Sequence, residues 1–104
     1  MQHAWDILRQ NKVPKFDLKP AEKFGELVYL LGPDDIPFNT ERSAQKLKDG
    51  LAGITEDDFI LLIGNPCFIG WTCYIAGALL NGKIRLLQWA KRDGDYRVIL
   101  SDLK

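Results

Sequence analysis

Histidine and cysteine are scarce in this chain. Its 104 residues include one histidine, His3, and two cysteines, Cys67 and Cys73. A single histidine argues against a Ser-His-Asp triad and against a metal site built on several histidines. The cysteines lie six positions apart in a segment of helical pattern, so their side chains point in different directions and do not pair. We predict no catalytic residue, no metal site, no cofactor and two reduced thiols.

An excess of charge of either sign is also missing. Lys and Arg number 14, as do Asp and Glu, so no overall field attracts the chain to nucleic acid or to an anionic membrane. Basic residues gather near the C-terminus and alternate there with Trp89 and Tyr96. Such a hairpin could follow a phosphate backbone, but charged edge strands also protect a sheet from aggregation. We favour protection over nucleic-acid binding. The basic residues concerned are Arg85, Lys91, Arg92 and Arg97.

Charged residues are absent from Phe59 to Gly82. The length of this segment suggests a membrane span, but Gly64-Asn65-Pro66 interrupts it. The interruption leaves about fourteen apolar residues where a spanning helix needs roughly twenty. The first residues, Met1–Asp6, also lack the basic start and apolar stretch of a secretory signal. We therefore expect no membrane partner.

The same segment contains the clearest structural signal of the sequence. Phe59–Ile63 is a short run apolar on both faces, which is typical of a central parallel strand. Asn65 follows as a helix N-cap, with Pro66 in the first helical position, where the missing N–H costs nothing. Asn81-Gly82 has the residues that end a helix. We predict a strand, a capped turn and a helix from Pro66 to Asn81.

Weaker signals complete the chain on either side. Glu26–Leu31 predicts a strand that ends at Gly32, and Asn39 or Thr40 can cap the helix that follows. We expect Gly53 to end that helix in the left-handed conformation. Lys83–Ala90 predicts another strand, which Asp93-Gly94 turns into a last antiparallel strand over residues 96–102.

The opening third of the chain is ambiguous. His3–Arg9 fits a strand or a helical turn, and Trp5 and Ile7 favour the strand. Asp17–Gly25 predicts a short helix with Pro20 near its start. The resulting order, β-α-β-α-β-α-β-β, indicates a single α/β domain over residues 1–104. We predict a three-layer sandwich of Rossmann-like type, with a mostly parallel sheet of four to five strands and a C-terminal antiparallel hairpin edge strand.

The helix predicted from Pro66 to Asn81 is apolar around most of its circumference. A helix of that kind must be covered on all sides, and a small domain has no second layer for the outer side. We therefore predict an interface between copies of the chain, with Gly70 and Gly77 allowing close approach of the backbones. The alternative is that the aromatic side chains lie flat on loops of their own domain. The predicted interface residues are Phe68, Trp71, Tyr74 and Ile75.

A ligand site is conceivable where the predicted strands end. A strand that runs into a helix N-terminus presents N–H groups that bind phosphate or carboxylate. However, Gly64-Asn65-Pro66 lacks both the Lys-Ser/Thr of a Walker loop and the glycines of a dinucleotide fingerprint. A plain capped turn is favoured here, with Cys67 as a structural cysteine. The candidate ligand-binding residues are Gly32, Gly64, Asn65 and Cys67.

Three segments carry a resemblance to a known group of proteins. They are residues 16–28, residues 58–66 and residues 85–89, in that order. Together they resemble a group of small proteins encoded by tailed bacteriophages. The resemblance implies a phage origin, the host cytoplasm as the working compartment and a Rossmann-like fold, but no particular activity. Members often carry Asp at the position of Asn65, a departure that further disfavours a metal or catalytic role for this turn.

The sequence is compatible with two functional hypotheses. The leading hypothesis is a phage accessory protein that binds a host or phage protein without catalysis, through its sheet edge or its apolar helix, and works as a homodimer. The alternative is a nucleotide-binding or phosphate-binding protein, or a small enzyme, that uses the turn at Gly64-Asn65-Pro66.

Overall fold

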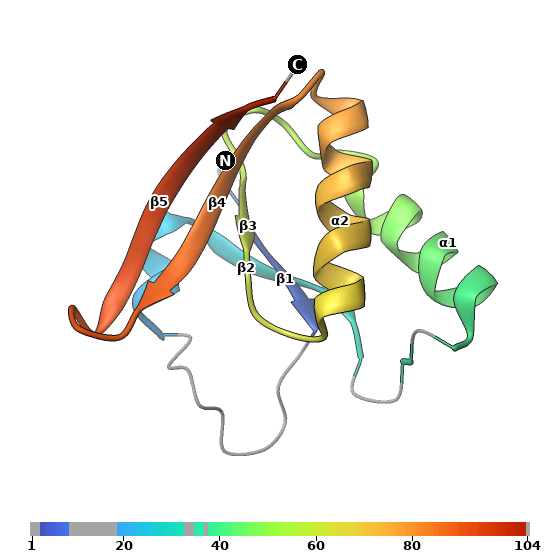
Figure 1. Cartoon of the computed structure of the whole chain (residues 1–104), viewed down its shortest axis with the longest axis horizontal. Helices are drawn as coiled ribbons and strands as arrows, with labels where there is room; N and C mark the ends of the chain where they lie inside the picture. Colours follow the sequence, from blue (N-terminus) through green and yellow to red (C-terminus); the bar gives the residue numbers. More distant parts are fainter. Residues whose placement is uncertain (1–2, 9–18, 33–34, 37, 104) are drawn as a thin grey trace.

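The computed structural model describes residues 3–8, 19–32, 35–36 and 38–103. Its elements follow one another as five strands, two α-helices and one 3₁₀ helix (Figure 1). In chain order they are β1 (His3–Leu8), η1 (Lys19–Phe24), β2 (Glu26–Leu31), α1 (Thr40–Leu51), β3 (Phe59–Leu61), α2 (Pro66–Leu79), β4 (Lys83–Ala90) and β5 (Asp95–Asp102).

The strands form one mixed sheet in the order β2-β1-β3-β4-β5. β1 pairs in parallel with β2 and with β3, and β3 pairs in parallel with β4. β4 and β5 form an antiparallel hairpin in which Trp89 lies opposite Tyr96. The carboxyl ends of β2, β1, β3 and β4 therefore lie at the same end of the sheet. β5 is the edge strand next to β4.

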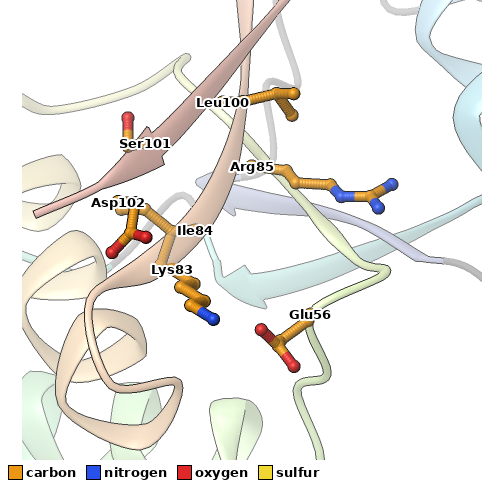
Figure 2. Close-up of a pocket in the computed structure, with 7 residues that line it drawn as sticks. All are labelled: Glu56, Lys83, Ile84, Arg85, Leu100, Ser101 and Asp102. Atoms are coloured by element: carbon orange, nitrogen blue, oxygen red, sulfur yellow. The ribbon is translucent and has the colours of Figure 1, made fainter. Parts of the chain in front are cut away.

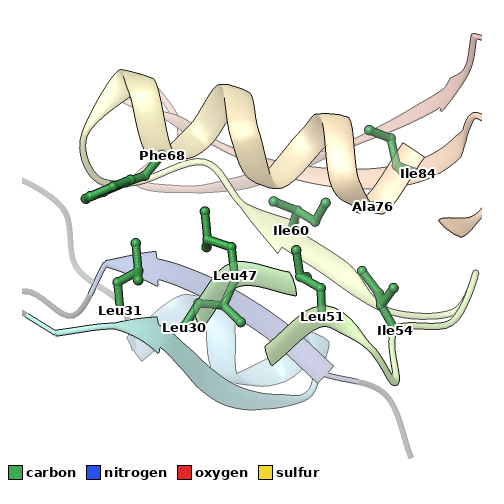
Figure 3. Close-up of a cluster of buried hydrophobic side chains, with 9 residues drawn as sticks. All are labelled: Leu30, Leu31, Leu47, Leu51, Ile54, Ile60, Phe68, Ala76 and Ile84. Carbon is green, nitrogen blue, oxygen red and sulfur yellow. The ribbon is translucent and has the colours of Figure 1, made fainter. Parts of the chain in front are cut away.

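Side chains of β3 alternate between two apolar clusters on opposite faces of the sheet. Ile60 belongs to the larger cluster, which contains Leu47 of α1 and Phe68 of α2 (Figure 3). Phe59 and Leu61 belong to the smaller one, which contains Ala21 of η1. The two-residue period of a strand thus places each β3 side chain in a core, and all three are buried.

The predicted three-layer sandwich of Rossmann-like type is wrong. Both α-helices lie on the same face of the sheet, where they contact each other. Among the described residues, the opposite face carries a single 3₁₀ helix of six residues, η1, and no α-helix. A 3₁₀ turn of this length does not form a helical layer.

Strand order explains why the helices share a face. From β1 the chain moves to β2 on one side, whereas from β2 to β3 and from β3 to β4 it moves the other way across the sheet. Parallel crossovers are right-handed, so a reversal of direction changes the face on which the connection runs. α1 and α2 must then lie together, while η1 lies opposite them.

Local signals at the centre of the chain are confirmed. The Asn65 side chain accepts a hydrogen bond from the Cys67 N–H at 2.8 Å, and Pro66 opens α2. Asn81 and Gly82 follow the helix with positive φ angles of 56° and 84°. In contrast, Gly53 does not adopt the positive φ that we expected, because α1 ends through Ala52 in a right-handed conformation.

One buried hydroxyl leads to a stability prediction. Thr72 Oγ1 on α2 is buried and has no hydrogen-bond partner in the part of the chain that the structure describes. Thr72→Val keeps the shape of the side chain and removes this unpaired group. We expect the free energy of unfolding to rise by about 1 kcal/mol, measured by urea titration.

A matched control for Thr72 exists in α1. Ser43 is also buried, but its hydroxyl donates a hydrogen bond to the Ile36 carbonyl at 3.0 Å. Ser43→Ala should therefore lower the stability while Thr72→Val raises it. A Thr72→Val protein less stable than the wild type would show that this hydroxyl has a partner.

Candidate functional site

The four predicted ligand residues gather at the carboxyl edge of the sheet. Gly32 follows β2, and Gly64 follows β3 with a positive φ of 127°. Asn65 and Cys67 begin α2 at the same edge. β1 separates the two groups because it lies between β2 and β3. The structure thus places these residues on one edge, one strand apart.

Two backbone donors at this edge are already engaged. The Gly32 N–H donates to Asp35 Oδ2 at 2.7 Å, and the Cys67 N–H donates to Asn65. Pro66 has no N–H. An incoming phosphate would therefore have to compete with side-chain oxygens of the protein itself for these donors.

A buried carboxylate adds negative charge to the same edge. The Asp35 side chain is 6% exposed, and Lys46 Nζ lies 2.9 Å from its Oδ1. Burial alone would raise the pKa of Asp35, but hydrogen bonds from Lys46 and from the Gly32 N–H, with the charges of Lys46 and Arg42, hold this pKa below its ordinary value. This pair was not predicted from the sequence, although acidic residues directly after a strand are a signal for it. The geometry does not favour an anion here.

The predicted interface residues of α2 fall into three environments. Phe68 is fully buried in the larger core cluster, so it is unavailable to another chain and leaves the predicted interface. Trp71 and Ile75 are half-buried, and they pack against the same cluster. Tyr74 is 79% exposed. Tyr74 is therefore the most exposed large side chain of α2, and Leu79, at the end of the helix, is 53% exposed.

Small residues surround Tyr74 on that face. Gly70 and Ala78 are exposed and Gly77 is half-buried. A Cβ atom added at Gly70 or Gly77 would meet nothing within 4 Å, so packing inside the subunit does not require either glycine. Glycine in an α-helix costs about 1 kcal/mol relative to alanine. A helix that keeps two of them on an open face leaves room for another backbone to approach.

Two open grooves flank Tyr74. One holds about 250 Å³ between α1 and α2, and apolar atoms form most of its lining. Thr40, Ala44 and Lys48 of α1 face Trp71 and Ile75 across it. The other holds about 530 Å³ on the opposite side of Tyr74, between α2 and Leu103. Tyr74 lines both grooves, so it forms a ridge between two hollows.

Other chemistry finds little support in the described residues. They contain no group of three His, Cys, Asp or Glu side chains placed to hold a metal ion. Among the helices that the structure describes, none is long and apolar enough to cross a membrane. Cys67 and Cys73 are free thiols, and burial raises the pKa of Cys73. The outward face of α2, with its two grooves, is the best-formed candidate site.

Comparison with known proteins gives one positive result. The family model described as "Phage Pam3 gp32-like protein" matches residues 1–103 of the chain. Neither the curated proteins nor the solved structures gave a match.

Proposed function

Since the chain belongs to the Phage Pam3 gp32-like protein family, we propose that it is a phage accessory protein that acts in the host cytoplasm, without catalysis, by binding a protein partner as a homodimer. The observation that carries this proposal is the outward face of α2. Tyr74 stands 79% exposed between two grooves, among small residues that the subunit itself does not need.

A second copy of the chain fits this face because the face is complementary to itself. In a two-fold dimer the same surface meets itself, so a ridge must lie beside a hollow that can receive it. Tyr74 is that ridge, and the groove between α1 and α2 begins beside it. Gly70 and Gly77 would let the two α2 helices approach closely. Aromatic residues buried at the centre of an interface commonly dominate its binding energy.

Sedimentation equilibrium tests the dimer. The wild type is expected to sediment as a dimer at tens of micromolar, and Tyr74→Glu as a monomer, because the buried carboxylate would have no partner. Gly77→Leu should also weaken the dimer, since the new side chain would separate the helices. Neither change should reduce the stability of the monomer, because Tyr74 is 79% exposed and a Cβ atom added at Gly77 meets nothing within 4 Å.

Tyr29→Glu is the matched control. Tyr29 is 43% exposed on β2, the strand at the far edge of the sheet from β5. The same change of aromatic side chain to carboxylate should leave the dimer intact there. A monomeric wild type, or a dimeric Tyr74→Glu, would remove the proposed α2 interface.

A further inference from the structure

The outer edge of β5 carries backbone groups that point away from the sheet. β4 is the only strand paired with β5 in the described chain. The Leu103 N–H donates to the Gly82 carbonyl at 2.9 Å, so Leu103 directs its N–H toward β4. Along an antiparallel strand the N–H groups point alternately toward the paired strand and away from it. Counting back from Leu103, Ile99 directs its N–H toward β4, whereas Val98 and Leu100 direct theirs outward. Neither outward group has a partner among the described residues.

The side chains at this edge are apolar and exposed. Val98, Ile99 and Leu100 are 43%, 37% and 72% exposed, and they follow one another along the middle of β5. Natural edge strands are usually protected by lysine, proline, a bulge or short length. β5 has eight residues and no proline, and its charged residues lie nearer its ends. The protective interpretation made from the sequence does not explain this centre.

We propose that β5 binds an extended, acidic segment of the partner protein, which adds to the sheet as a further strand. This inference rests on the proposed function only in that the chain acts by binding a protein. An extended backbone is the ligand that matches outward N–H and C=O groups on every second residue. Apolar side chains of the segment would cover Val98 and Leu100, which share a face because they lie opposite Leu87 and Arg85.

Charge around the hairpin favours an acidic segment. Asp93 and Asp95 are already paired with Arg97 and Lys23. Arg85 forms an ion pair with Asp57 at 3.7 Å, and Lys83 lies opposite Asp102 of β5. The cations Lys91 and Arg92, in the turn between β4 and β5, form no ion pair within the described part of the chain. Opposite charge across an interface favours association and suppresses wrong partners.

A cavity adjoins the exposed edge near the end of β5. It holds about 220 Å³, and β5 contributes Leu100, Ser101 and Asp102 to its wall. Figure 2 shows Lys83 and Glu56 pointing toward one another across this space, with Arg85 on the same strand as Lys83. A side chain of the added strand could enter here. The lining of the cavity carries both signs of charge, so the cavity would select the size and shape of the side chain that enters it. The preference for an acidic segment comes from the unpaired cations of the hairpin.

Titration with two short blocked peptides, followed by NMR, tests this proposal. In one peptide valine alternates with glutamate, and in the other valine alternates with lysine. The glutamate peptide should shift the backbone amide signals of Val98 and Leu100 and protect both amides from exchange with solvent. The lysine peptide should bind at least fivefold more weakly, because like charges at the hairpin repel. Equal binding of both peptides, or binding of neither, would overturn the proposal.

Proline substitution distinguishes the loss of an outward N–H group of β5 from the loss of the hairpin fold. Leu100→Pro removes only an outward N–H, which edge strands tolerate, and should abolish peptide binding while the hairpin signals persist. Ile99→Pro is the contrast, since it removes a bond to β4 and should disrupt the hairpin. If Leu100→Pro unfolds, Val98→Glu provides the second variant, and it should weaken the glutamate peptide selectively. Undiminished binding by a folded Leu100→Pro or by Val98→Glu would contradict strand addition at this edge.

The monomeric Tyr74→Glu protein keeps this test distinct from that of the dimer. It should bind the glutamate peptide as tightly as the wild type, because Tyr74 lies on α2 and outside β5. If the wild type proves monomeric, the α2 interface fails and peptide binding at β5 is unaffected. If the Val98 and Leu100 amide signals instead depend on protein concentration without peptide, a second copy occupies β5 and this inference is overturned.

Discussion

Phe68→Ala is expected to lower the free energy of unfolding by about 3–5 kcal/mol. Phe68 is among the largest side chains that the structure buries completely, and it belongs to the cluster between both α-helices and the sheet (Figure 3). Its ring also contacts Trp71, with ring centroids 5.8 Å apart. Truncation removes buried apolar surface and leaves a cavity that the rigid sheet cannot fill. Urea unfolding followed by tryptophan fluorescence measures the loss.

Tyr74→Ala is the control for Phe68, from the same helix. Tyr74 is 79% exposed, so its truncation should change the stability of the monomer by no more than about 0.5 kcal/mol. Both measurements belong at protein concentrations low enough for the chain to be monomeric, where association contributes nothing to the unfolding free energy. A small effect at Phe68 would mean that α2 is not held against the sheet as the structure describes.

The contrast between these two residues shows how far the sequence could guide the fold. Both are aromatic residues of one apolar helix, and helical spacing alone gave them the same predicted role at an interface. Phe68, Thr72 and Ala76 form the stripe that the subunit buries, which became evident only with the sheet in place. The composition of the helix indicated that most of its surface must be buried, but it did not indicate which face the subunit itself buries.

Local chemistry was predictable wherever a few neighbouring residues determine the backbone. Asn65 and Pro66 begin α2 because one side chain accepts an N–H and the other lacks one. Gly94 adopts a positive φ of 61° in the turn before β5, as Asp-Gly between two strands predicts. Each of these predictions depends on residues close together in the chain.

Long-range arrangement was not predictable in the same way. The face on which each connection lies follows from the order of the strands, and that order depends on contacts between distant segments. The segment over Asp17–Gly25 was expected to be a helix; its first two residues lie outside the described residues, and Lys19–Phe24 forms the 3₁₀ helix η1, which is too short to make a layer. The ion pair at the carboxyl edge of the sheet was not predicted either, because Asp35 in a loop meets Lys46 of α1 eleven positions further along the chain.

That pair gives the second large effect, an acid-sensitive contribution to stability. The Asp35 pKa is lower in the folded protein than in the unfolded chain. The pair therefore stabilises the folded protein fully at pH values above the pKa of Asp35 in the unfolded chain. The contribution is lost as the pH falls through the folded pKa, below about 4. Wild type and Asp35→Asn should therefore differ most near neutral pH, and their unfolding free energies should converge in acid.

Removing the cation alone should lower the free energy of unfolding more than removing both charges of the pair. Among the described residues, Lys46→Met leaves the 6%-exposed carboxylate of Asp35 with the Gly32 N–H as its remaining hydrogen-bond donor. We expect a loss of about 1–3 kcal/mol at pH 7, toward the lower end because the Lys46 side chain is itself 41% exposed. In the Asp35→Asn background the same lysine change should cost little, since no buried charge remains to be compensated. A double-mutant cycle by urea unfolding at pH 7 measures the difference, and additive losses would show that the two side chains do not interact in solution.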